Sequence, residues 1–121
     1  MNADGMKKEN KNFYSFHLIC DFKLPKFIED KTKIKNILWK AAQVANNTPL
    51  KVAVHKFPSQ GITGVVILAE SHIAIHSWPE YRYLAIDIFT CGKNTRPYAA
   101  LEYLKKVFSP KKIKIRMIKR G

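Results

Sequence analysis

The chain has 121 residues, of which 46% are hydrophobic and 12% aromatic, enough apolar material for one packed domain. This composition excludes a disordered or fibrous chain, and no uncharged stretch approaches the roughly 18 apolar residues of a membrane-spanning helix. The first twelve residues are polar and lack the apolar segment of a secretory signal. We therefore expect a disordered polar tail over residues 1–12 and a single domain over residues 13–121.

The chain is strongly basic, because 22 Lys and Arg against 9 Asp and Glu give a formal net charge of +13. Eight of the basic residues lie between Lys105 and Arg120, so the charge is concentrated near the C-terminal end. Such a charge makes nucleic acid a partner to consider, but no recognised binding motif accompanies it, and a lysine-rich face is commonly only solvated. The two cysteines, Cys20 and Cys91, form neither a CxxC pair nor a zinc-type cluster, which favours reduced thiols in the cytoplasm.

The first half of the chain alternates strand-like and helical patterns. Residues 13–22 are dense in aromatic and aliphatic side chains and predict a buried strand. Residues 28–46 carry apolar side chains at helical spacing and predict a helix, which Asp30 or Thr32 can cap. Alternation over residues 50–57 and a β-like run over residues 62–69 predict two adjacent strands joined by a turn.

The second half continues with strands, a helix and a final strand. Residues 71–78 and 83–90 alternate in polarity and predict two more strands. Residues 97–108 predict a second helix with one apolar stripe, formed by Tyr98, Leu101, Leu104 and Phe108. Two residues can cap its N-terminus, Asn94 and Thr95. Residues 112–117 predict a last strand with one apolar and one basic face.

This order, β-α-β-β-β-β-α-β without internal repeats, indicates an α+β fold. We expect a mostly antiparallel sheet with two helices on one face. The other face would be bare in a monomer, so we expect a second copy to pack on it and form an αββα sandwich homodimer.

Unusual polar groups gather between residues 55 and 92. Taken singly, each has an ordinary explanation, since a histidine such as His72 is commonly a satisfied structural residue and Cys91 a small buried hydrophobe. Together they form three motifs in order: Glu-Ser-His from residue 70, Ile-His-Ser-Trp-Pro-Glu from residue 75 and Asp-Ile-Phe-Thr-Cys-Gly from residue 87. With Phe-His-Leu-Ile-Cys-Asp-Phe from residue 16, this pattern resembles the proenzymes of the prokaryotic S-adenosylmethionine decarboxylases over most of the chain.

The resemblance implies a precursor that cuts itself between Glu70 and Ser71 into a β chain, 1–70, and an α chain, 71–121. The Ser71 hydroxyl attacks the Glu70 carbonyl, and Ser71 is converted to a covalently bound pyruvoyl group. The family assigns removal of the Ser71 α-proton to His76, a residue type suited to general-base work near neutral pH. The matching hydroxyl eight residues before the cut, Thr63, is assigned to oxyanion stabilisation.

In the mature enzyme that the resemblance implies, the pyruvoyl group holds the substrate amine as a Schiff base and accepts electrons as CO₂ leaves. Cys91 is then the proton donor of catalysis. Phe57 stacks on adenine, and Glu80 hydrogen-bonds the ribose hydroxyls. His17 and Trp78 support the site, and Asp87 is structural.

The sequence therefore predicts a cytoplasmic, pyruvoyl-dependent S-adenosylmethionine decarboxylase without a metal, which supplies the aminopropyl donor of spermidine synthesis. An alternative is decarboxylation of arginine or ornithine on the same fold. It stays open because Arg82 stands where a glycine is common and because the turn from residue 57 reads Phe-Pro-Ser-Gln-Gly. A remote alternative, from a different class, is a nucleic-acid-binding module driven by the basic C-terminal strand.

Overall fold

The computed structural model describes residues 15–121, so the tail expected over residues 1–12 and the first two residues of the first expected strand lie outside the described residues. The elements follow in the order β1 (Ser15–Lys23), α2 (Lys31–Val44), β2 (Pro49–Lys56), β3 (Ile62–Leu68), β4 (His72–Trp78), the short 3-10 helix η1 (Pro79–Tyr81), β5 (Tyr83–Cys91), α3 (Pro97–Phe108) and β6 (Lys112–Lys119). Each strand and helix that the sequence predicts is present, in the predicted order.

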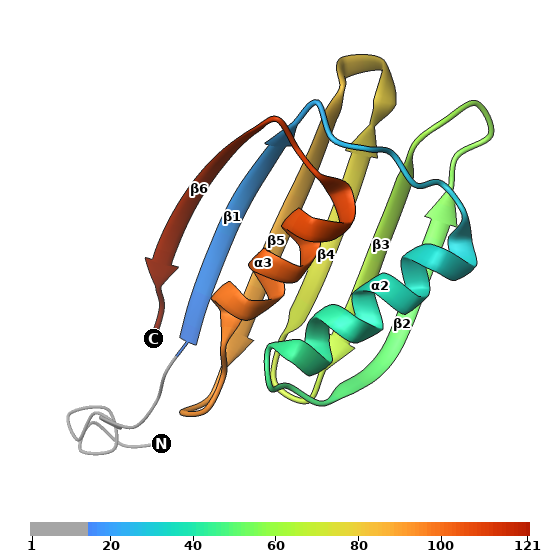
Figure 1. Ribbon diagram of the computed structural model, residues 1–121. Coiled ribbons are helices and arrows are strands. Elements are labelled where there is room, and N and C mark those ends of the chain that lie inside the picture. Colours follow the sequence, from blue (N-terminus) through green and yellow to red (C-terminus); the bar gives the residue numbers. More distant parts are fainter. Residues whose placement is uncertain (1–14) are drawn as a thin grey trace.

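The six strands form one sheet in the order β2-β3-β4-β5-β1-β6, and every neighbouring pair is antiparallel. Both helices lie against the same face of this sheet (Figure 1). The predicted α+β class, with an antiparallel sheet and two helices on one face, is therefore confirmed. We call the other side of the sheet the open face.

The hydrophobic core lies between the helices and the sheet. Alternate strand residues point into it, so Ile73 and Ile75 of β4 are buried while their neighbours His72 and His76 belong to the open face. Gly64 of β3 lets α2 approach closely, since a Cβ on this residue would lie 2.9 Å from Leu38 Cδ1. The largest fully buried side chains include Phe22, Phe108, Leu18, Ile34, Leu38 and Ile86.

The helix ends agree with the sequence in one case and differ in the other. Asp30 caps α2, because its side chain accepts a hydrogen bond from the Lys33 N–H at 2.9 Å. The prediction that Asn94 or Thr95 caps α3 is wrong: Arg96 is the N-cap residue and makes no side-chain cap bond. Pro97 at the first helical position has no N–H to satisfy, which makes a polar cap less necessary.

The two expected cap residues bind the end of α2 instead. The Asn46 side-chain amide donates to the Asn94 carbonyl, and that of Asn47 donates to Thr95 Oγ1, both at 2.9 Å. The predicted stripe of α3 also needs one correction, because Tyr98 is 50% exposed while its other members are buried. Tyr98 lies on the solvent side of the first turn.

The last strand has the two faces that the sequence predicts. Register with β1 sets Ile115 opposite the buried Cys20 and Lys114 opposite Asp21 of the open face. Ile113, Ile115 and Met117 therefore lie on the helix side, whereas Lys112, Lys114, Arg116 and the apolar Ile118 lie on the open face. All of β6 is exposed at this edge of the sheet. Across residues 15–121, no helix is long and apolar enough to cross a membrane.

Candidate active site

The peptide bond between Glu70 and Ser71 lies in the tight turn that joins β3 to β4. The Leu68 N–H donates to the Ser71 carbonyl at 2.8 Å, which leaves Ala69 and Glu70 as a two-residue loop. The Ala69 N–H donates to the Thr48 carbonyl at 3.0 Å and holds this loop against the start of β2. Glu70 is exposed, whereas Ser71 Oγ is buried and has no hydrogen-bond partner among the described residues.

Cys91 ends β5 beside this turn. Glu70, Cys91, Lys93 and Asn47 are among the residues that line a polar cavity of about 230 Å³ between the turn, the end of α2 and the loop before α3. Burial and the Glu70 carboxylate raise the pKa of the Cys91 thiol, against an opposing hydrogen bond from the Gly92 backbone. The thiol is therefore held in the protonated form that a proton donor requires.

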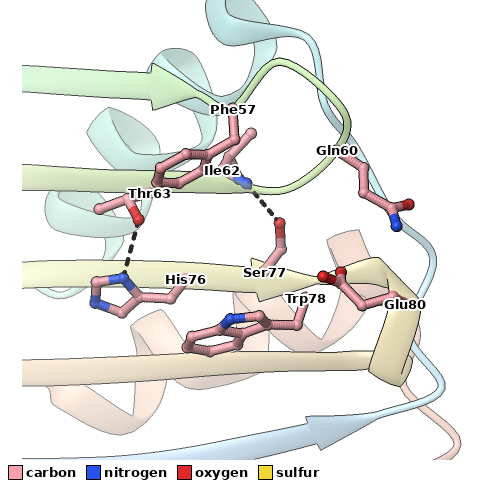
Figure 2. A pocket seen from close by; sticks show the side chains of 8 residues that line it. All are labelled: Phe57, Gln60, Ile62, Thr63, His76, Ser77, Trp78 and Glu80. Atoms are coloured by element: carbon pink, nitrogen blue, oxygen red, sulfur yellow. Dashed lines mark hydrogen bonds between the residues drawn. The ribbon is translucent and has the colours of Figure 1, made fainter.

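Thr63 and His76 form a second group, on β3 and β4. They are directly opposite in the strand register, and Thr63 Oγ1 lies 3.2 Å from His76 Nδ1 (Figure 2). The His76 ring is tilted against Trp78, with ring centroids 6.1 Å apart, and Trp78 stacks on Tyr83 at 5.5 Å. A histidine that is oriented by a hydroxyl and flanked by an aromatic ring has a defined position on the open face.

Thr63, His76 and Trp78 border a second cavity of about 230 Å³, at the end of the strands where the β2–β3 and β4–β5 turns lie. Figure 2 shows Phe57 just after the end of β2, Trp78 at the end of β4, and Glu80 on the turn that follows Trp78. Both aromatic side chains are partly exposed, Phe57 at 45% and Trp78 at 39%. The arrangement offers ring faces and one carboxylate to a ligand that has a flat base and hydroxyl groups.

Two residues that sequence reasoning missed hold this cavity in shape. Ser77 Oγ accepts the Ile62 N–H at 2.9 Å, and the Glu29 carboxylate accepts the Gly61 N–H at 2.5 Å across the β2–β3 turn. Gly61 has φ +96, and a Cβ there would lie 3.0 Å from the Ser77 carbonyl oxygen. Ser77 is part of the Ile-His-Ser-Trp-Pro-Glu motif, which could have pointed to it, whereas Glu29 lies outside every motif.

The structure brings some predicted site residues together and separates others. Glu70, Ser71 and Cys91 lie at one end of β4, and Thr63 and His76 lie together further along. Ser71 and His76 are five residues apart along extended backbone, which corresponds to roughly 16 Å between their Cα atoms. One chain alone does not bring the His76 ring to the Ser71 α-carbon.

The remaining predicted residues lie on the open face beside these groups. His17 Nε2 is 3.0 Å from Asp87 Oδ1, and the Phe89 ring contacts His17 and His72 on one face of the sheet. Asp87 therefore orients His17. Within residues 15–121, no three His, Cys, Asp or Glu side chains gather closely enough to hold a metal ion.

Comparisons with known proteins identify the family. Residues 16–121 match the family described as S-adenosylmethionine decarboxylase. The S-adenosylmethionine decarboxylase proenzyme of Thermodesulfovibrio yellowstonii is 44% identical over 107 residues, which cover 87% of this chain and 79% of that protein. That of Methanococcus maripaludis strain C5 is 44% identical over 94 residues, covering 78% of this chain and 77% of the relative.

A solved structure agrees with these sequence matches. The crystal structure of the adenosylmethionine decarboxylase from Aquifex aeolicus VF5 superposes with a TM-score of 0.81 at 33% identity, covering 91% of this chain and 92% of that one. The residues that match the family, 16–121, include both helices and both groups of site residues. The chain belongs to the S-adenosylmethionine decarboxylase family.

Proposed function

We propose that the protein is a self-processing decarboxylase of S-adenosylmethionine. One observation carries the proposal. In this member of the family, the Glu-Ser-His motif begins at the two-residue turn between β3 and β4, and Cys91 lies beside that turn. A turn at the end of a hairpin can be cut while the strands on both sides stay paired. The two fragments would then remain one folded unit.

The surroundings of Ser71 fit a pyruvoyl group formed from this residue. Its Oγ has no partner among the described residues and is free to react, while its carbonyl is fixed by the Leu68 N–H. Loss of the hydroxyl in the reaction therefore breaks no hydrogen bond of the fold. When present, a pyruvoyl group supplies the electron sink for decarboxylation.

Self-cleavage follows from side chains of the two groups. The Ser71 hydroxyl oxygen bonds to the Glu70 carbonyl carbon, the amide C–N bond breaks, and the hydroxyl proton goes to the Ser71 nitrogen. His76 then takes the Ser71 α-proton, so that the Glu70 carboxylate leaves by β-elimination. Thr63, hydrogen-bonded to His76, directs its hydroxyl toward the oxyanion or keeps the imidazole oriented.

The separation of the two groups supports a homodimer. A second copy on the open face, related by a two-fold axis that lies between the two sheets and passes over β4 near Ala74, would set His76 of the partner subunit above the Ser71 end of the first chain. The small side chain of Ala74 permits a close approach, and partly exposed apolar residues such as Ile67 and Ile118 supply buried area. In this αββα sandwich each site contains Ser71 and Cys91 of one chain with Thr63 and His76 of the other.

In catalysis, the residues of the second cavity bind the nucleoside part of the substrate. Phe57 and Trp78 offer ring faces to adenine and to the sulfonium, and Glu80 accepts hydrogen bonds from ribose hydroxyls. Cys91, with its raised pKa, returns a proton to the substrate carbon after CO₂ has left. The relatives named above support this substrate, and no comparison favours arginine or ornithine.

The first experiment is an intact-mass measurement of the denatured protein beside a Ser71→Ala variant. Two fragments that break between Glu70 and Ser71, absent from the variant, are expected, with the C-terminal one lighter because its serine has become pyruvoyl. Release of CO₂ from S-adenosylmethionine, and not from arginine or ornithine, then identifies the substrate. An uncut wild-type chain would refute self-processing.

The cytoplasmic location stays a prediction.

A further inference from the structure

Two buried hydroxyls lack a hydrogen-bond partner among the described residues, Ser71 Oγ and Thr90 Oγ1. Thr90 is fully buried, with 0% of its surface exposed. Elsewhere in the same region the hydroxyls are used, since Ser77 accepts a backbone N–H and Thr63 contacts His76. A buried hydroxyl without a partner destabilises the fold, so its presence at Thr90 needs another reason.

The topology brings these two hydroxyls together. The paired register of β4 and β5 ends at His72 opposite Phe89, and one further step along both strands sets Ser71 opposite Thr90. Directly opposite residues of antiparallel strands have Cα atoms about 4.5–5.5 Å apart, so a rotation about χ1 can bring the two hydroxyls, which are not bonded in the resting chain, within hydrogen-bond distance. The effect of Glu70 on the pKa of Cys91 agrees with this continuation, because the next step pairs these two residues.

We propose that Thr90 is a positioning residue for self-cleavage: its Oγ1, which makes no hydrogen bond in the resting chain, accepts one from the Ser71 hydroxyl when that hydroxyl turns toward the Glu70 carbonyl carbon. This inference rests on the proposed function. The step that Thr90 serves is the acyl shift, in which the ester C–O bond forms, the amide C–N bond breaks and the hydroxyl proton passes to the Ser71 nitrogen. No oxidant or reductant is involved.

Threonine suits this role better than it suits the core. Its hydroxyl both donates and accepts hydrogen bonds without carrying a charge, and its β-branch restricts χ1, so the oxygen has few alternative directions. Valine has nearly the same shape and would leave no unpartnered oxygen beneath the helices. The hydroxyl is therefore explained by the reaction rather than by packing.

The test compares Thr90→Val and Thr90→Ser with the wild-type chain. Chains are synthesised in a short pulse, and the fraction cut between Glu70 and Ser71 is followed by intact mass. We expect Thr90→Val to slow cleavage by about tenfold or more, as loss of an orienting contact does, while Thr90→Ser stays near the wild-type rate. Ile88→Val, which shortens a buried side chain on the same strand and face, serves as the matched control and should cut normally.

Two further measurements separate positioning from a structural role. The melting temperature of Thr90→Val should equal or exceed that of the wild type, because no hydrogen bond is lost. Hydroxylamine, which cuts esters and not amides, should leave uncut Thr90→Val chains intact. It should cut chains of His76→Ala, which stop at the ester.

The outcomes are distinct. If Thr90→Val is cut at the wild-type rate, this inference alone is overturned. Uncut Thr90→Val chains that hydroxylamine cuts would also overturn it, because Thr90 would then act after the acyl shift. A wild-type chain that stays uncut would refute the proposed function and this inference with it.

Discussion

The separation of the two groups along β4 predicts that variants damaged in different groups repair each other. The perturbation is co-expression of His76→Ala and Cys91→Ser chains that carry tags of different mass. Because roughly 16 Å of extended strand lies between Ser71 and His76 of one chain, a histidine side chain cannot bridge the gap, and the base must come from a second copy. A mixed dimer then contains one intact site and one damaged in both groups.

The expected numbers follow from random pairing, which puts about half of all chains into mixed dimers. A His76→Ala chain is cut only in a mixed dimer, by the histidine of its partner, so about half of these chains should be cut. A Cys91→Ser chain is cut in its own homodimer and not in a mixed one, so about half of these should also be cut. Decarboxylation should reach about a quarter of the wild-type level, because half the dimers carry one working site of two.

Intact mass of the denatured mixture reads both chains at once. If each chain uses its own histidine, every Cys91→Ser chain is cut, no His76→Ala chain is cut, and decarboxylation is absent. That pattern would refute the intersubunit site. His72→Ala is the matched control, since His72 is next to Ser71 in its own chain and should not be required for cleavage.

Three other predictions concern single positions. Gly64→Ala should destabilise the fold by about 1–3 kcal/mol in urea unfolding, because the new Cβ would lie 2.9 Å from Leu38 Cδ1, and an unchanged midpoint would contradict this packing. Glu70→Gln, made in the uncut Ser71→Ala chain, should lower the pKa of Cys91, so the pH at which the thiol begins to react with an alkylating reagent should fall; no movement would exclude this coupling. Arg82→Gly should leave cleavage unchanged and raise stability by at most about 1 kcal/mol, since Arg82 has φ 51, a left-handed conformation that glycine adopts freely; a loss of stability in thermal unfolding would argue against this view.

The sequence predicted the elements well because the strands are amphipathic on a sheet with one covered face. Ile73 and Ile75 alternate with His72 and His76 in the sequence. In the structure the two isoleucines are buried and the two histidines are partly exposed. The helix caps were harder to predict. Asn94 and Thr95 have good capping chemistry, but the Thr95 hydroxyl accepts a long-range hydrogen bond from Asn47, and Asn94 is bonded to Asn46 through its backbone carbonyl. No local pattern reveals such bonds.

The site residues were predictable one by one, but their grouping was not. A motif gives the spacing of Ser71, His76 and Cys91 along the chain, whereas distance depends on whether the intervening backbone is extended or folded back. The extended strand β4 separates the first two, and the β4–β5 pairing returns the third to the turn. Glu29 had no sequence signal, because its partner, the Gly61 N–H, is a backbone group that any residue but proline provides.

The high positive charge is compatible with a cationic substrate because of where the fold puts it. The basic face of β6, including Lys114 and Arg116, lies three strand positions from β4, which corresponds to roughly 14 Å across the sheet. That exceeds the Debye length of about 8 Å at physiological ionic strength, so repulsion at the cavity beside Glu80 is screened. Acidic groups of the open face also lie between, since Asp21 is directly opposite Lys114. The basic face of β6 therefore lies at a separate edge of the sheet, away from the cavity beside Glu80.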